Sequence, residues 1–195
     1  MFDWAKQILK RFQPPPNWRV PVIILAGIFT GTGLFVFYTS RAWSYVSDDP
    51  ATCVNCHIMR TQYVTWHHSS HREHATCNDC HVPHDNIVRK YYFKANDGLR
   101  HATIFTLNTY PQTIYMHKPG QRVVQENCIR CHGNLTAMVK ANVDLDAILA
   151  GNGKRCWDCH RDVPHGTVKS LSATPYGTAP VPKTDTPNWL KKLIK

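Results

Sequence analysis

The chain has 195 residues, only 18% of them charged, and its 23 basic and 13 acidic side chains leave a formal net charge of +10. That length accommodates one domain of ordinary size and little more. A basic balance is common in nucleic-acid-binding proteins, but no nucleic-acid-binding motif accompanies these residues, so we expect no nucleic-acid partner.

Residues 1–19 form a short, basic, amphipathic segment. Aromatic and aliphatic side chains are interleaved there with Lys6, Lys10 and Arg11, and three prolines at positions 14–16 interrupt the pattern. Positive charge beside an apolar span is typical of the cytoplasmic side of a membrane. The sequence therefore predicts a cytoplasmic N-terminus.

Residues 20–40 are predicted to form one transmembrane helix. From Val20 to Tyr38 there is no charged residue, and this length is about the 20 residues that a helix needs to cross a membrane. The alternative is a cleaved signal peptide, but the apolar stretch is too long and lacks a small-residue cleavage site at its end. Trp43 and Tyr45 are residue types that favour a membrane–water interface, here the one on the outer side of the span. We expect an uncleaved anchor in the inner membrane, followed by a periplasmic domain.

Residues 42–166 contain the pentapeptide C-x-x-C-H four times, and these copies use all eight cysteines. The copies are Cys53-Val-Asn-Cys56-His57, Cys77-Asn-Asp-Cys80-His81, Cys128-Ile-Arg-Cys131-His132 and Cys156-Trp-Asp-Cys159-His160. Two thiols at this spacing can both add to one haem, and the following His can bind its iron. Zinc sites and disulfides would not need the repeated His, and a thioredoxin-like pair normally occurs once. The motifs predict four covalently bound haem c groups.

Four haems in roughly 125 residues leave little room for a polypeptide core, so the haems themselves should form most of it. The predicted fold is mainly α with much irregular structure, comprising one N-terminal transmembrane helix and a small haem-packed multihaem cytochrome c domain. Covalent haem is attached outside the cytoplasm. Its propionates, two on each haem, would cancel about eight of the excess positive charges.

The long interval between the second and third motifs predicts a helix over residues 85–108. Four polar residues recur on one face of it: Lys90, Lys94, Asp97 and His101. A charge stripe of this kind is usually a solvated face. The alternative is a face that meets a small polar ligand, and the periodicity leaves both interpretations open.

Residues 167–195 are rich in Thr, Pro, Ser and Ala, which predicts an extended, partly disordered arm. The arm closes with the basic amphipathic segment 189–195, a possible contact for a membrane or a partner, and we assign it no role.

The chain resembles the NapC/NirT family of membrane-anchored tetrahaem quinol dehydrogenases from the membrane helix to His165. The resemblance is carried by Cys53–Met59, Trp66–His71, Cys77–Pro83 and Lys94–His101, and by His165 five residues after His160. Within the family it is most similar to the small subunits of ammonia-forming nitrite reductases. It implies oxidation of menaquinol and electron transfer to a pentahaem catalytic partner. One alternative is a donor to periplasmic nitrate reductase or to several reductases. Another is a stand-alone reductase, but such enzymes typically carry a motif that ends in Lys, and all four motifs here end in His.

The resemblance also implies roles around the first haem. Met59 would bind the iron of haem 1, with His57 displaced from it. Lys90 would bind a quinol oxygen and Asp97 would accept a proton, so that Asp97 is the expected catalytic residue. Lys94 is the alternative for the lysine role.

For the other three haems the resemblance implies histidine ligands. His81 and His132 are the motif ligands of haems 2 and 3, and His71 and His165 are their distal ligands, with the pairing left open. His160 binds haem 4, whose other side would take a lysine from the catalytic partner. The simplest interpretation of the remaining non-motif histidines is that they are surface residues or residues that support a ligand. They are His67, His68, His74, His84 and His117, with His101 a weaker ligand candidate.

Overall fold

The computed structural model describes residues 12–137, 145–166 and 177–180 of the chain. Its contacts divide the chain into two units, Met1–Trp43 and Ser44–Lys195. Throughout the described residues the regular structure consists of α-helices and 3₁₀ helices joined by irregular connections, with no strand. This confirms the predicted fold class.

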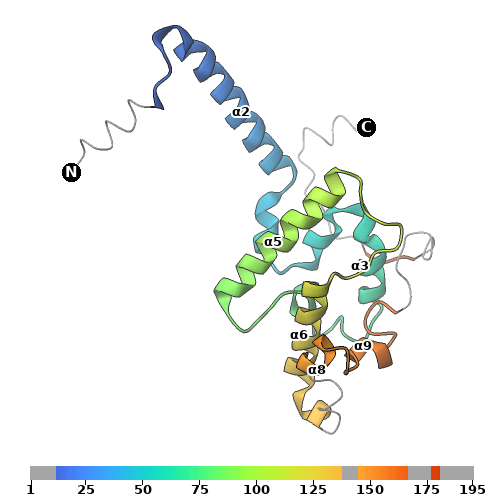
Figure 1. The fold of residues 1–195 in the computed structure, drawn as a ribbon. Coiled ribbons are helices and arrows are strands. Elements are labelled where there is room, and N and C mark those ends of the chain that lie inside the picture. Colours follow the sequence, from blue (N-terminus) through green and yellow to red (C-terminus); the bar gives the residue numbers. More distant parts are fainter. Residues whose placement is uncertain (1–11, 138–144, 167–176, 181–195) are drawn as a thin grey trace. The chain divides into compact units, whose positions relative to one another are not determined.

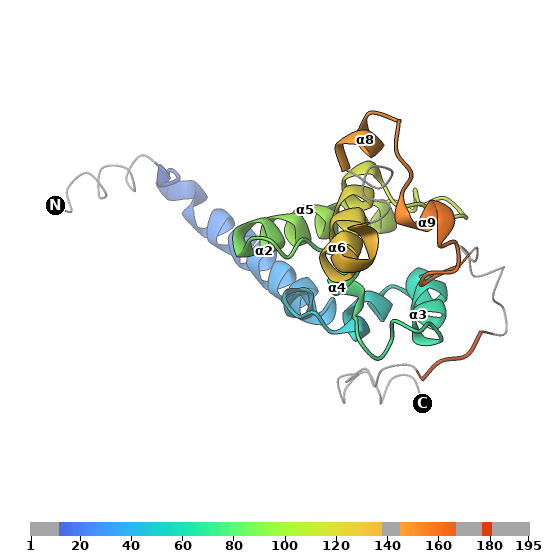
Figure 2. The same ribbon diagram turned by 90° about the horizontal axis from the view of Figure 1, so that it is seen from below.

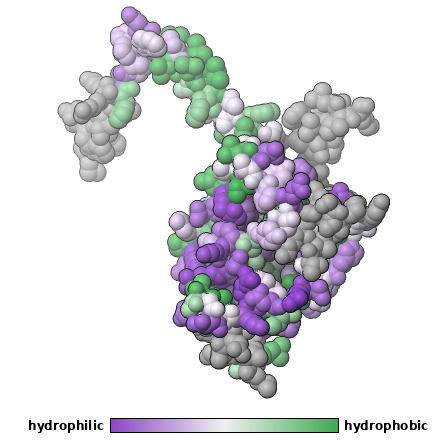
Figure 3. Space-filling view, turned by 45° about the vertical axis from the view of Figure 1, so that its right-hand side comes forward, coloured by the Kyte–Doolittle hydropathy of each residue, from purple (hydrophilic) through white to green (hydrophobic). Residues whose placement is uncertain are grey.

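The first unit is built around α2 (Arg19–Thr39), which follows the short 3₁₀ helix η1 (Pro16–Trp18). None of its side chains is buried in the structure, and the most apolar 18-residue stretch within Pro16–Thr39 has a mean hydropathy of 2.2. Figure 3 shows the resulting apolar surface in green. A helix that is apolar all round and 21 residues long, about 30 Å, has the composition and length of a membrane span. The basic segment before it lies mostly outside the described residues.

The second unit consists of short helices with longer α5 and α6 among them (Figure 1). In chain order they are η3 (Pro50–Asn55), η4 (His57–Met59), α3 (Arg60–His67), α4 (Cys77–His81), α5 (Ile87–Thr106), α6 (Lys118–Thr136), α8 (Leu145–Leu149) and α9 (Cys156–Cys159). The 3₁₀ helix η2 (Ala42–Val46) covers the boundary between the two units in sequence.

Helix α5 confirms the helix predicted from the long interval, and it is slightly shorter than expected at both ends. It begins after Asn86, whose side-chain Oδ1 accepts hydrogen bonds from the amides of Val88 at 2.7 Å and Arg89 at 3.3 Å. It ends close to Asn108, which has a φ of 53°, a left-handed conformation that stops a helix.

Helix α6 organises the second unit. It contacts α4 and α8, and Figure 2 shows α4 directly beside it. The buried Asn127 Nδ2 donates to the carbonyls of Cys80 at 3.0 Å and Val82 at 2.8 Å. The buried Gln125 Oε1 accepts the amide of Cys156 at 3.0 Å. One helix therefore carries the third cysteine motif and also holds the second and fourth motifs in place.

The apolar core of the second unit is very small. Among the described residues, the only buried hydrophobic side chains are Val64, Val82 and Val123. A polypeptide of this length that folded on its own would bury many more. The remainder of the core has to come from bound apolar groups, as expected for a domain packed around haems.

Candidate functional site

Three of the four cysteine motifs lie on helical turns. The second and fourth begin α4 and α9, and the third lies near the end of α6, so each pair of thiols is one turn apart on one face. In α4 and α9 an aspartate precedes the second cysteine. Asp79 accepts the amide of Thr76 at 2.8 Å, and Asp158 accepts the amide of Arg155 at 2.9 Å. These caps start each helix at its first cysteine.

The first motif has a different backbone. Cys53 lies in η3, but Cys56 is extended, with φ −95° and ψ 114°, so the motif is not one continuous helical turn. The exposed His57 begins the next turn, and its ring lies edge-on to Phe105 with centres 6.0 Å apart. Met59 lies half-buried just before α3. The first motif therefore differs from the other three in its backbone between the two cysteines.

The four motifs lie next to one another in sequence order. Helix η3, which carries Cys53, contacts α4, α4 contacts α6, and Gln125 of α6 accepts the amide of Cys156. Cys80 lies close enough to Cys131 to interact with it electrostatically. All eight cysteines are free, so every thiol is available for attachment to a haem.

Two motif histidines face two histidines from elsewhere in the chain. The ring centres of His81 and His165 are 6.2 Å apart, and those of His71 and His132 are 6.1 Å apart. An imidazole nitrogen binds a transition metal at about 2 Å and the ring centre lies about 1 Å behind it, so two imidazoles on one iron have centres roughly 6 Å apart. Each pair therefore fits one haem iron, and the structure resolves which distal histidine faces which motif.

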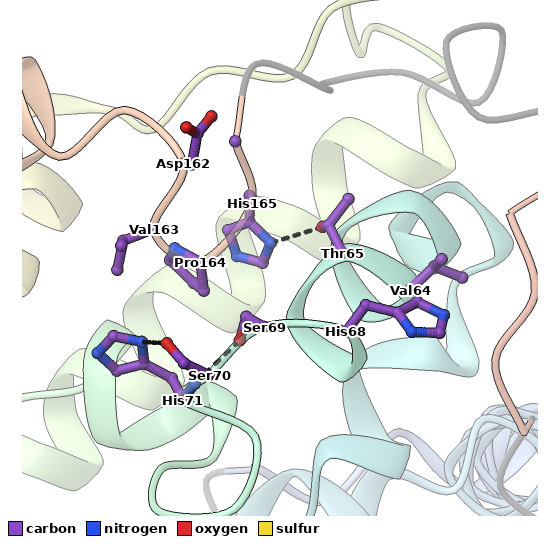
Figure 4. Close-up of a pocket in the computed structure, with 11 residues that line it drawn as sticks. Val64, Thr65, His68, Ser69, Ser70, His71, Asp162, Val163, Pro164 and His165 are labelled. Atoms are coloured by element: carbon purple, nitrogen blue, oxygen red, sulfur yellow. Dashed lines mark hydrogen bonds between the residues drawn. The ribbon is translucent and has the colours of Figure 1, made fainter.

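The His81–His165 pair lies in a poorly solvated environment. Burial lowers the pKa of His81, and burial together with the neighbouring His81 lowers the pKa of His165 to about 4. Both rings are therefore neutral at pH 7, the state in which imidazole binds a metal. His165 and His71 line one cavity of about 530 Å³ between the end of α3 and residues 162–166 (Figure 4).

Both lysines on the polar face of α5 bind Asp48, which precedes the first motif. Lys94 Nζ donates to Asp48 Oδ1 at 2.9 Å, and Lys90 Nζ binds Asp48 Oδ2. Asn78 Nδ2 also donates to Asp48 Oδ1 at 2.9 Å. Partial burial would raise the pKa of the Asp48 carboxyl, but these hydrogen bonds outweigh it and hold the pKa well below its usual range. The Asp48 carboxylate thus holds the ammonium groups of Lys90 and Lys94 close to each other.

Asp97 lies on the same helix within a separate polar cluster. Arg100 Nε lies 3.1 Å from Asp97 Oδ1, and His117 Nε2 lies 3.5 Å from the same oxygen. His101 Nε2 lies 3.6 Å from Asp97 Oδ2. Burial lowers the pKa of both histidines, and the Asp97 carboxylate acts against that shift. Asp97 thus faces one cation and two imidazoles. This carboxylate has proton-accepting groups beside it.

Sequence reasoning missed several partners of the site residues. Asp48 and His117 are brought to α5 by long-range contacts for which the sequence gives no local signal. The predicted supporting role fits His68, whose Nε2 lies 2.7 Å from the carbonyl of Thr178, and His84, whose Nε2 lies 3.1 Å from the carbonyl of Asn78. Apart from residues 177–180, the predicted C-terminal arm lies outside the described residues.

Three observations together define a c-type cytochrome. The cysteines form pairs without disulfides, two pairs of histidines lie at the spacing of two ligands on one iron, and the apolar core is smaller than a polypeptide of this length needs. The family is also clear. A model of the NapC/NirT cytochrome c family, N-terminal region, matches residues 15–170, so the chain belongs to this family.

Named relatives agree with this assignment. The chain is 48% identical over 149 residues to the cytochrome c-type protein NrfH of Wolinella succinogenes, which covers 73% of this chain and 84% of that protein. It is 36% identical over 126 residues to the cytochrome c nitrite reductase subunit NrfH of Nitratidesulfovibrio vulgaris, covering 65% of this chain and 73% of that one. A crystal structure of the cytochrome c nitrite reductase NrfHA complex bound to the HQNO inhibitor matches with a TM-score of 0.52 and 33% identity, over 77% of this chain and 95% of that chain.

Proposed function

We propose that this chain is a membrane-anchored quinol dehydrogenase subunit that oxidises menaquinol and reduces a periplasmic nitrite reductase. The observation that carries the proposal is the continuous order of the four motifs, with two facing histidine pairs, in a unit whose α5 also presents paired lysines and a carboxylate. Once attached through the eight cysteines, four haems supply one-electron redox chemistry between quinol and partner.

The proposed iron ligands follow the geometry of the second unit. His81 and His165 would hold one iron, that of haem 2, and His71 and His132 would hold another, that of haem 3. At the first motif, the break in the helix at Cys56 supports Met59 rather than His57 as the ligand. At the fourth motif, His160 would bind one side of the iron and a lysine of the catalytic partner the other.

The proposed quinol site uses the polar face of α5. Oxidation of a quinol releases two electrons and two protons, so the site needs a donor that orients the hydroxyl and a base that accepts a proton. Lys90 or Lys94, held near each other by Asp48, would bind a quinol oxygen. Asp97 would take one proton at a time, because its carboxylate is the acceptor on that face, and would release it by way of the neighbouring His117 so that it can accept the second. The HQNO-bound relative supports a quinone-like ligand for this fold.

We further propose the topology expected from the sequence. Residues 1–19 would lie in the cytoplasm, 20–40 would cross the inner membrane, 42–166 would form the periplasmic haem domain, and 167–195 would be an arm. Helix α2 supports the membrane span by its length and apolar surface, and the excess of basic residues before it supports the orientation.

The partner is tested by purifying the full chain in mild detergent without cross-linking, followed by haem staining and mass spectrometry of everything that copurifies. We expect a larger pentahaem cytochrome in stoichiometric amount. A tetrahaem protein that purifies alone and reduces periplasmic nitrate reductase equally well would instead indicate a donor with several acceptors.

A further inference from the structure

His165 reaches its position opposite His81 from the loop that follows α9, and its ring also touches α3. His165 Nδ1 lies 2.9 Å from the hydroxyl oxygen of Thr65, as Figure 4 shows. Thr65 is part-buried within α3, a regular helix, whereas His165 lies in the irregular segment that precedes Gly166. The hydrogen bond therefore ties a loop histidine to a fixed point in the fold.

The neighbours of Thr65 determine which atom donates in that hydrogen bond. Thr65 Oγ1 lies 2.9 Å from the carbonyl of Thr61 and 3.1 Å from the carbonyl of Gln62, one turn earlier in the helix. A carbonyl oxygen only accepts, and the hydroxyl has one proton to donate. That proton is used within α3, so the hydroxyl oxygen accepts a hydrogen bond from the Nδ1–H of His165.

With its proton on Nδ1, His165 keeps a free lone pair on Nε2. We propose that Thr65 is a positioning residue that fixes His165 in its Nδ1–H tautomer and presents Nε2 to the metal between His165 and His81. The inference rests on the proposed ligand set for haem 2, and it identifies the residue that orients one ligand. A metal-binding histidine that donates its other N–H becomes a more basic ligand, which favours the oxidised iron.

The other histidine pair provides a matched comparison. His71 Nδ1 lies 3.5 Å from the hydroxyl of its own neighbour Ser70, too long for a strong hydrogen bond (Figure 4). Ser70 is exposed and adjacent to His71 in the chain, so it cannot tie the ring to another element. Removing the Ser70 hydroxyl should therefore leave His71 unchanged, whereas removing the Thr65 hydroxyl should alter His165.

The experiment compares Thr65→Val, Thr65→Ser and Ser70→Ala in the full-length protein with its haems attached. Potentiometric titration followed by electron paramagnetic resonance (EPR) reports the midpoint potential and the low-spin signal of each haem. We expect Thr65→Val to raise the potential of one haem and change its low-spin signal. Thr65→Ser should restore both values, and Ser70→Ala should match the wild type. Haem content by mass verifies that each variant carries all four groups.

Thr65→Val with unchanged potentials and signals would overturn the inference, as would an equal shift in Ser70→Ala. A further variant, His165→Ala, separates this failure from failure of the ligand set. If His165→Ala converts one haem to high spin while Thr65→Val has no effect, only the role of Thr65 is wrong. If His165→Ala leaves every low-spin signal intact, the proposed ligand set is wrong and the inference falls with it.

Discussion

The imidazole rings of His71 and His132 face each other with centres 6.1 Å apart and planes inclined at 70°. His71 lies in the connection between α3 and α4, and His132 follows the last cysteine of the third motif near the end of α6. This spacing suits one iron bound from both sides.

Replacing His71 with Ala should leave that iron bound by His132 alone. We expect one of the haems to change from low spin to high spin in EPR, while mass spectrometry finds all four haems still attached. The matched control is His74→Ala, an exposed residue of the same connection. Retention of every low-spin signal in His71→Ala would contradict the assignment of this pair.

The contact of Asp48 with two lysines should stabilise the second unit in a pH-dependent manner. The pKa of Asp48 is lower in the folded protein than its usual value. The stabilisation by the Asp48 carboxylate is therefore fully present above about pH 4 and is lost as the pH falls through the folded-state pKa. Asp48 is partly exposed, so we expect Asp48→Asn to lower the free energy of unfolding by only about 1 kcal/mol at pH 7.

Thermal unfolding of both proteins between pH 3 and pH 7 provides the measurement, with those limits chosen to bracket about pH 4, the usual carboxyl pKa. Glu73→Gln, which removes an exposed pair with Arg72, serves as the control and should change the melting temperature little. A difference between wild type and Asp48→Asn that stays the same at every pH would show that the charge of Asp48 is not the cause.

The amide of Asn127 should be important for folding around the second motif. It is buried and donates to two carbonyls of that motif region, so Asn127→Ala would leave two acceptors without their donor. We expect a loss of about 2 kcal/mol in the free energy of unfolding and less haem attached at Cys77 and Cys80. Asn134→Ala, an exposed change on the same helix, should have neither effect. Equal haem occupancy in the two variants would contradict this role.

Asp97→Asn preserves the size of the side chain but removes its ability to accept a proton at neutral pH. If Asp97 is the base, this variant should lose most of its quinol oxidation while retaining all four haems and their potentials. Asp85→Asn is a suitable control, because Asp85 carries an exposed ion pair with Arg89 just before the same helix. Normal turnover of a menaquinol analogue by Asp97→Asn would exclude Asp97 as the proton acceptor.

Much of the architecture could be predicted because it depends on local patterns. The spacing of Cys77 and Cys80 identifies an attachment site, and the uncharged run that forms α2 identifies a membrane span. The pairing of His71 with His132 and of His165 with His81 could not be predicted, since it depends on loops that bring together residues far apart in the chain. Likewise, periodicity identified the charged face of α5 but not Asp48, because that contact joins elements far apart in the chain.

In the proposed function, electrons enter this chain from a quinol. The most direct test places the purified full-length protein in proteoliposomes and follows haem reduction by a menaquinol analogue in a stopped-flow spectrometer, with and without HQNO. We expect rapid reduction by the quinol, inhibition by HQNO, and loss of the fast phase in Asp97→Asn but not in Asp85→Asn. Reduction by dithionite but not by the quinol in the wild type would contradict it.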